Sequence, residues 1–524
     1  DRLVLGDTAR FGTFLQARMD SEFGGLEAAA SKLTGIEEKD ITGGASYRAS
    51  WLGKRGLMLG VGAKVSAEDR FWFHLFADGL HDKAEDRGVL RVPGAEREEL
   101  RGWVRARGRE SLDEREWVDF AFSQQGDAGV QAEFFEREFL SYEERETYMH
   151  WRRGRNGNFA SARIKLRAGQ FRNEVEELPS LGYSRGRAPV FELKGQPVLY
   201  SSSLDVGRYV RREAQGGTIS PFDPTFDSLL GTRELSRLDT RHRLELPKRF
   251  AEQSALVTPF LEFAGTAWSE GVDPSTSLHR GAISAGFELS TTLWSRAEGG
   301  AMHTVAPYLS VSSDLWSGAS DGEPIQLDSI EDPLPGDHID VGLHSRWSEP
   351  STGEAIDLSV FGRYASDSSS VLPLEVLAEY LGELGGRPIA LQHDGRYDLD
   401  ASETLYSRVA LGLEVQDGLA METGFHHGKD TSGGDLFEAA SVAARWRISP
   451  KWELEARQTV SLLDSEGLSE RVTLRRYGHD FVLDMELSNR SGEGGSSFSF
   501  SFSPVVGWAS NRLGILDHWL TSRR

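Results

Sequence analysis

Residues 159–168 read FASARIKLRA, a stretch in which small or apolar side chains alternate with polar or charged ones. An extended chain places Ala160, Ala162, Ile164, Leu166 and Ala168 on one face and Ser161, Arg163, Lys165 and Arg167 on the other. A period of two residues predicts a β-strand with one apolar and one polar face. A run of about 9–11 residues can cross a bilayer as a tilted strand.

The same alternation recurs along most of the chain, for example at 283–293, 408–415, 480–487 and 497–503. Turn-forming residues such as Gly385-Gly386 and Ser449-Pro450 separate the runs. We count about 23 candidate strands, and single-chain bacterial barrels usually have an even number. The sequence therefore predicts an all-β fold: a large antiparallel transmembrane β-barrel of about 22–26 strands with long loops. A soluble β-sandwich would also alternate, but open sheets rarely exceed about ten strands.

The composition agrees with many strands joined by turns, since the chain of 524 residues contains 57 Gly, 27 Phe, 13 Trp and 12 Tyr. The mean hydropathy is -0.41. No segment approaches the roughly 18 unbroken apolar residues of a membrane helix. These properties exclude a helical membrane protein but not a barrel, whose strands show only one face to lipid.

The net charge of -22 argues against nucleic acid as a partner. The chain contains no cysteine, which excludes disulfides, thiol catalysis and Cys-ligated metals. It begins at Asp1 without a basic and apolar leader, so we expect that a signal peptide has been removed or that the chain is trimmed.

Three stretches break the alternation. The aromatic and acidic stretch 127–155 predicts a short helical or irregular insertion, and 313–340, rich in Asp, Glu and Pro, predicts a long loop. Residues 509–524 follow the last alternating run. We therefore expect a barrel over 1–508 and a short C-terminal tail over 509–524.

Motifs for catalysis or metal binding are weak. Gly318–Gly322 matches the G-x-S-x-G pattern but falls in the acidic, proline-containing stretch instead of between a buried strand and a helix. His426 and His427 would point to opposite faces of a strand. The acidic stretch 313–340 could hold Ca²⁺ or Mg²⁺, although such loops are more often only solvated. We predict no enzyme active site, no cofactor and no metal.

The polar face of 159–168 has two interpretations. Arg163, Lys165 and Arg167 could line a luminal path for an anionic group, because Arg and Lys bind phosphate and carboxylate. They could instead form structural ion pairs across the lumen, since Glu288 and Glu414 fall on comparable faces.

Several motifs occur in an order that resembles the LPS-assembly protein LptD (organic solvent tolerance) family. They are Trp117-Val118-Asp119-Phe120, the aromatic and acidic 134–139, Glu146-Thr147-Tyr148, Leu178-Pro179, Arg237–His242, Val257–Phe260, His303–Tyr308, Pro450–Leu454 and Leu474–Phe481. The resemblance covers about residues 100–505.

The resemblance implies an integral outer-membrane translocon that inserts lipopolysaccharide, or a similar amphipathic lipid, into the outer leaflet. It also implies an LptE-like lipoprotein plug and a periplasmic LptA-like bridge as partners. The chain departs from the family in three respects. An N-terminal jellyroll is not evident, the family's cysteines are missing, and no proline precedes Pro93.

A lateral exit for lipid would lie where the first and last strands meet, because closing a sheet brings them together. The sequence predicts that the strand around Phe11–Met19 pairs with the strand around Ser496–Pro504. Gly12 and Pro504 would weaken that pairing. The predicted seam residues are Phe11, Gly12, Thr13, Phe498, Phe500 and Pro504.

Two other functions remain open. A passive porin or solute channel would show the same alternation but keep every strand pair closed. A barrel enzyme would need a convergent set of His, Ser or Asp on adjacent strands, which the sequence does not display.

Overall fold

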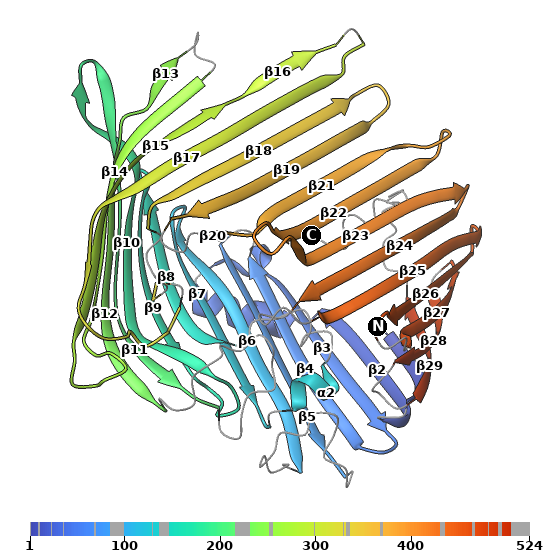
Figure 1. Cartoon of the computed structure of the whole chain (residues 1–524). Helices are drawn as coiled ribbons and strands as arrows, with labels where there is room; N and C mark the ends of the chain where they lie inside the picture. Colours follow the sequence, from blue (N-terminus) through green and yellow to red (C-terminus); the bar gives the residue numbers. More distant parts are fainter. Residues whose placement is uncertain are drawn as a thin grey trace.

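The computed structural model describes residues 2–8, 11–22, 24–34, 36–67, 70–83, 99–127, 129–135, 146–214, 231–250, 255–297, 299–328, 330–331, 336–366, 370–429, 435–463, 467–479, 481–490 and 495–504. The predicted tail, 509–524, lies outside these residues. The described residues form one antiparallel sheet that closes on itself (Figure 1). No helix among them combines the length and apolar character needed to cross a membrane.

The first half of the sheet, with its helices, contains β1 (Arg2–Thr8), β2 (Gly12–Glu22), α1 (Gly24–Thr34), η1 (Glu38–Asp40), β3 (Thr42–Leu52), β4 (Gly56–Ala67), β5 (Phe71–His81), β6 (Leu100–Asp113), β7 (Glu116–Gln125), α2 (Val130–Phe134), β8 (Thr147–Arg155), β9 (Asn158–Leu166), β10 (Glu174–Leu193), β11 (Gln196–Arg212), β12 (Arg233–Glu245), β13 (Lys248–Phe250), β14 (Ala255–Trp268) and β15 (Leu278–Thr291).

The second half contains β16 (Leu293–Arg296), β17 (Met302–Ala319), β18 (His338–Glu349), β19 (Glu354–Ala365), β20 (Ser370–Val371), β21 (Leu374–Glu383), β22 (Pro388–Asp398), β23 (Glu403–Gln416), β24 (Leu419–Lys429), β25 (Asp435–Ser449), β26 (Trp452–Ser461), β27 (Gly467–Tyr477), β28 (Phe481–Arg490) and β29 (Gly495–Pro504).

The 29 segments make 26 strands. In three places two consecutive segments pair with the same neighbouring strand, one after the other, and so form one interrupted strand. β12 and β13 both pair with β14, β15 and β16 both pair with β17, and β20 and β21 both pair with β19. Pro247 and Pro373 occupy two of the three breaks, where proline cannot donate a hydrogen bond to the ladder. The count is even and within the predicted range.

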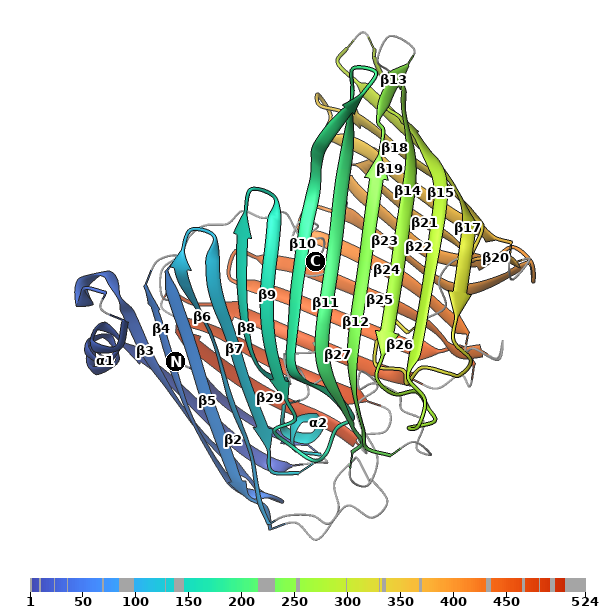
Figure 2. The ribbon, with the colours of Figure 1, turned by 90° about the vertical axis from the view of Figure 1, so that its left-hand side faces the viewer.

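The two ends of the barrel differ in their connections. One end, the turn rim, has short turns except for the β2–β3 connection, which contains α1. In the two-residue turn Asn156-Gly157 both residues have positive φ, as type I′ hairpins require. The other end, the loop rim, has the long connections β5–β6, β7–β8, β11–β12 and β17–β18. Figure 2 shows the turn rim toward the top and α2 near the bottom, at the loop rim. Outer-membrane barrels place short turns in the periplasm, so the loop rim faces outward from the cell.

Alternation places apolar side chains on the outside of the wall. On β4, Leu57, Leu59 and Val61 are all more than half exposed, as lipid-facing residues are in a barrel without its bilayer. The chain is therefore an integral outer-membrane protein.

The structure refines the predicted irregular stretches. Near 127–155, α2 is helical, but Thr147–Arg155 forms the barrel strand β8. Consecutive polar residues on β8, such as Arg152 and Arg153, hide its alternation. The predicted loop 313–340 is shorter, because β17 continues to Ala319 and β18 begins at His338.

The barrel closes differently from the prediction. β1, the strand before the one proposed, pairs with β29 over Leu3–Asp7, and β2 pairs with β1 and β3. The predicted first strand was wrong because the tight turn after Thr8 leaves room for one more strand. In that turn Phe11 N donates to Thr8 Oγ1 (2.9 Å), and Gly12 has φ 65°.

Candidate functional site: the luminal wall and two inward segments

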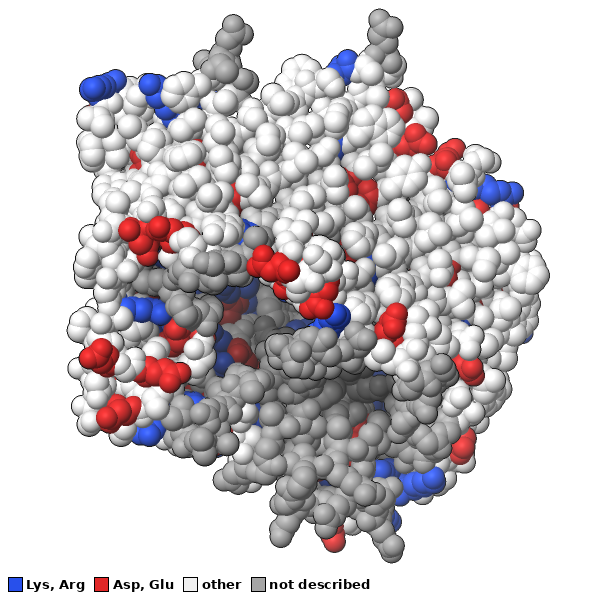
Figure 3. Space-filling model, viewed as in Figure 1, with Lys and Arg blue, Asp and Glu red and all other residues white. Residues whose placement is uncertain are grey.

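The luminal face of β6 is strongly basic. Arg101, Arg105, Arg107 and Arg109 alternate with residues on the lipid-facing side, and Trp103 lies among them. Lys64 on β4 and Arg152 on β8 extend this basic surface along the wall. Figure 3 shows Lys and Arg, together with Asp and Glu, inside the opening of the barrel.

The opposite wall, formed by β24–β28, is balanced in charge. Arg475 contacts Glu453 (3.2 Å) and Asp484 (2.7 Å), and Arg457 contacts Glu422 (3.4 Å). Cations and carboxylates alternate across neighbouring strands here, so this part of the lumen is polar without a net basic surface.

Arg101 holds the described part of the segment between β7 and β8 against the luminal wall. This buried guanidinium contacts Asp127 (2.5 Å), Asp82 (3.0 Å) and Glu133 of α2. Arg55 also contacts Asp82 (3.4 Å). Buried charges remain ionised only when they are paired, so Arg101 and three carboxylates hold one another at the loop rim.

Apolar contacts seat α2 beside the same arginine. Val130 and Phe135 are buried in a cluster with Trp103, whose ring meets that of Phe135 edge-on at 5.2 Å between centroids. Phe134 stacks on Phe11, in the turn between β1 and β2, at 5.7 Å. The helix therefore lies against the luminal wall close to the closing strands.

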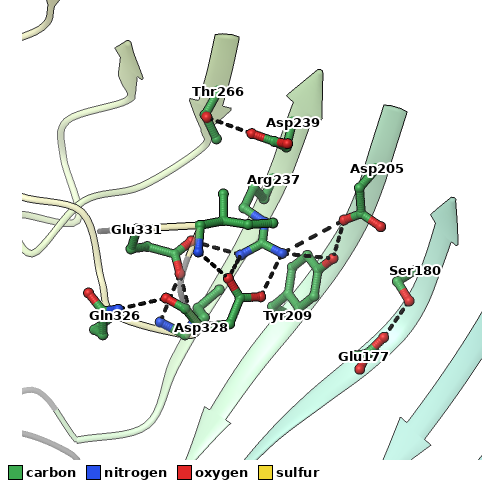
Figure 4. A network of polar contacts seen from close by, with 12 residues as sticks. Glu177, Ser180, Asp205, Tyr209, Arg237, Asp239, Thr266, Gln326, Asp328 and Glu331 are labelled. Carbon is green, nitrogen blue, oxygen red and sulfur yellow. Dashed lines mark hydrogen bonds and ion pairs between the residues drawn. The ribbon is translucent and has the colours of Figure 1, made fainter. Parts of the chain in front are cut away.

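Arg237 on β12 binds a second inward segment, the inward loop, which we define as residues 320–328, 330 and 331. Its guanidinium contacts Asp328 (2.9 Å) and Glu331 (2.8 Å), and it lies over the Tyr209 ring. Trp268 Nε1 donates to Glu331 (3.1 Å). Figure 4 shows both carboxylates pointing toward Arg237.

An apolar cluster seats the inward loop in the same way. Ile325 is fully buried against Tyr209, Leu235, Trp268 and Leu278. The loop therefore covers the luminal side of β11–β15 at the loop rim. The predicted acidic stretch is thus partly structural, since two of its carboxylates neutralise a buried arginine.

The three residues of the predicted luminal path, Arg163, Lys165 and Arg167, take part in ion pairs and hydrogen bonds. Arg163 contacts Glu146 (2.7 Å) and Lys165 contacts the same carboxylate (2.6 Å). Burial raises the pKa of Glu146, at the loop rim just before β8, but Lys165 and Arg163 outweigh burial and hold this pKa below its usual range. Arg167 donates instead to the Glu213 carbonyl (2.6 Å).

Arg167 and Arg101 both line one cavity. It has a volume of about 700 Å³ and is lined by residues of β6, the end of β7 and the β9–β10 connection, including Trp103 and Phe171. The cavity lies beside the end of β7, which pairs with β8 only over Glu116–Ala121.

The predicted seam residues do not all lie at the strand pair that closes the barrel. Phe498 and Phe500 lie on β29 opposite Asp7 and Leu5 of β1. Gly12 and Thr13 lie one strand further on, opposite Thr8 and Asp7. Pro504 ends β29 opposite Phe481 of β28.

The remaining motifs show no catalytic geometry. Ser320, the serine of the G-x-S-x-G match, donates to the His279 carbonyl (3.2 Å) in the connection after β17. His426 and His427 are consecutive on β24 and so point to opposite faces. Within the described part of the chain, no three His, Cys, Asp or Glu side chains could hold a metal ion together.

Sequence reasoning missed Arg101 and Arg237. The alternation of Arg101, Trp103, Arg105 and Arg107 is visible in the sequence, and it marks a basic luminal face. Burial of Arg101 and Arg237 depends on carboxylates up to 94 residues away in long connections, which no local pattern reveals.

No protein-family model and no curated protein matches the chain. Solved structures similar to it include the siderophore receptor PirA from Pseudomonas aeruginosa (9% identity, 96% of this chain and 79% of that one, TM-score 0.37). BauA, the ferric preacinetobactin receptor from Acinetobacter baumannii, gives the same identity, coverages and TM-score. The FrpB iron transporter from Neisseria meningitidis is 8% identical, with 96% of this chain and 80% of that one covered and a TM-score of 0.35.

These comparisons overturn the resemblance to the LptD family. No family model supports it, and the solved structures named above are siderophore and iron receptors. The expected lipopolysaccharide substrate and the LptE-like and LptA-like partners were therefore wrong. The motifs that suggested them are short and common in barrels, since alternation and aromatic residues serve any lipid-facing wall. Identities of 8–9% with TM-scores of 0.35–0.37 also transfer no ligand to this chain.

Proposed function

We propose that the protein conducts hydrophilic solutes across the outer membrane through its lumen, and that α2 and the inward loop narrow this route from the loop rim. The observation that carries the proposal is the ionised luminal face. Charged side chains line both the β4–β9 wall and the β24–β28 wall, whereas the outer face is apolar.

Polar lining supports conduction for a physical reason. A hydrated solute loses part of its hydration shell in a narrow passage, and charged and hydrogen-bonding groups replace it. An apolar inner face would expel both water and solute.

The proposal that the inward loop narrows the luminal route can be tested at Arg237. Asp328 and Glu331 remain on the wall because Arg237 neutralises them there. Removing one member of a buried ion cluster leaves the others uncompensated, at a cost of about 3–5 kcal/mol. The loop should therefore leave the wall when Arg237 loses its charge.

The experiment is single-channel recording from the full chain in planar bilayers. We expect wild type to conduct in discrete steps and Arg237→Gln to change the open-state conductance and its fluctuations. The double substitution Asp328→Asn with Glu331→Gln should reproduce the effect. Arg457→Gln, which removes a luminal charge paired with Glu422 on the other wall, serves as the matched control and should have a much smaller effect.

Two outcomes would contradict the proposal. If folded wild type and both loop variants conduct no ions, the lumen is not a solute route. If Arg237→Gln and Arg457→Gln alter conductance equally, the inward loop does not restrict the path.

A further inference from the structure

Three side chains form a row across the luminal face, and we call it the basic row: Lys64 on β4, His74 on β5 and Arg107 on β6. The strand register places Lys64 directly opposite His74, and His74 directly opposite Arg107. Directly opposite side chains have Cβ atoms about 4.5–5.5 Å apart. Lys64 and Arg107 thus place a positive charge on either side of His74, an arrangement that favours an anion beside this ring.

Two luminal carboxylates, one on β5 and one on β7, already contact other cations. Asp78 contacts Arg48 (3.4 Å), while Asp119 contacts Arg109 (2.6 Å) and Arg152. Neither carboxylate therefore neutralises the basic row.

A cavity of about 170 Å³ lies at the basic row. Its described lining contains no acidic residue and consists of Lys64, His74, Phe76, Arg105, Ala106, Arg107, Ala121 and Phe122. Its size admits a small ion but not a large organic solute. The cavity thus combines positive charge with a volume suited to a compact anion.

Two further observations show that the cavity is organised for a polar ligand. His74 Nδ1 is buried and, among the described residues, has no hydrogen-bond partner. A buried polar atom normally has one, so a ligand atom is expected beside it. Arg105 is held over the rings of Trp103 (4.2 Å) and Phe76 (5.1 Å), which fixes a further guanidinium at the edge of the cavity.

We propose that the basic row binds a phosphate group, either free phosphate or the phosphate of a small ester. Arg107 can donate two parallel hydrogen bonds to phosphate oxygens, and Lys64 adds a point charge. His74 supplies a further ring nitrogen. The proposal concerns binding alone and does not depend on conduction.

The test is calorimetric titration of the detergent-solubilised full chain with inorganic phosphate at pH 7 and low salt. We expect one saturable site. Arg107→Gln and Lys64→Gln should each weaken binding at least tenfold, because each removes a charge-assisted contact. Arg457→Gln removes one luminal positive charge on the other wall and should leave the affinity unchanged within twofold.

A second titration with glycerol 3-phosphate distinguishes the two sources of the phosphate group. Tighter binding of inorganic phosphate would indicate free phosphate, and tighter binding of the ester would indicate a phosphorylated solute. Heat-modifiable gel mobility confirms that each variant is folded, and Arg107→Lys, which keeps the charge, should retain part of the affinity.

Absence of saturable binding to folded wild type would overturn the proposal, as would equal weakening by Arg457→Gln and Arg107→Gln. A barrel that binds phosphate but conducts no ions would contradict only the proposed channel function.

Discussion

Substitutions of single side chains on the outer wall test which face of the barrel contacts lipid. Val61 is 55% exposed near the middle of β4 and points away from the lumen. Val61→Arg should lower the free energy of unfolding in lipid by about 2–4 kcal/mol, because a cation is placed near the bilayer midplane. Urea titration in vesicles measures this change.

The matched control is luminal. Arg471 is half-exposed and lies 3.6 Å from Glu486. Exposed ion pairs contribute about 0–1 kcal/mol, so Arg471→Gln should have a small effect. Equal losses for Val61→Arg and Arg471→Gln would contradict the assignment of the two faces.

The lowered pKa of Glu146 predicts a pH dependence at the level of one residue. Its unfolded-state pKa is near the ordinary value of 4.5, and its folded-state pKa is lower. A depressed carboxyl pKa contributes stability that is present above the unfolded value and is lost as pH falls through the folded value.

Unfolding free energy should therefore fall less steeply below about pH 5 in Glu146→Gln than in wild type. Denaturant titrations across this range provide the measurement. Glu375→Gln is a control, since Glu375 forms an exposed ion pair with Arg396. Identical pH profiles for wild type and Glu146→Gln would show that the contacts with Lys165 and Arg163 do not persist in solution.

At the scale of elements, the position of α2 depends on its ion pair with Arg101, because the helix of five residues is too short to be stable by itself. Arg101→Gln should therefore release 129–135 from the wall, and hydrogen exchange of these amides should accelerate at least tenfold. β24–β28 should exchange as in wild type. Unchanged protection of 129–135 would mean that the cluster around Trp103 and Phe135 is sufficient.

The sequence predicts elements well where one face meets lipid. Alternation located most strands, because burial in a bilayer imposes a period of two wherever the strand lies. It failed at Thr147–Arg155, where polar residues continue through the outward positions, and it overlooked the short strand Arg2–Thr8. The inward segments could not be predicted, because their positions depend on ion pairs between residues far apart in the chain, such as Arg237 and Glu331.

At the scale of the whole molecule, the closing strands can be tested by cross-linking. Val4 and Ser501 lie directly opposite each other on β1 and β29. Cysteines at these two positions should form a disulfide in a chain that otherwise has none. Non-reducing gels after mild oxidation reveal it as a change in mobility.

Thr13 provides the control for this experiment. It pairs with Asp7 on the far side of β1, so cysteines at Thr13 and Ser501 should remain reduced. Cross-linking of that pair, and not of Val4 with Ser501, would show that β2 closes the barrel.

The same closure has a consequence for how the protein folds. Every other strand pairs with a neighbour in sequence, but Leu3 pairs with Phe502, at almost the full length of the chain. Local pairings form early, and contacts of great sequence separation are slow because a long loop must first be closed. The wall should therefore grow hairpin by hairpin as an open, curved sheet. Its final and slowest step should be the meeting of its two unpaired edges, and until then both edges can pair with other proteins.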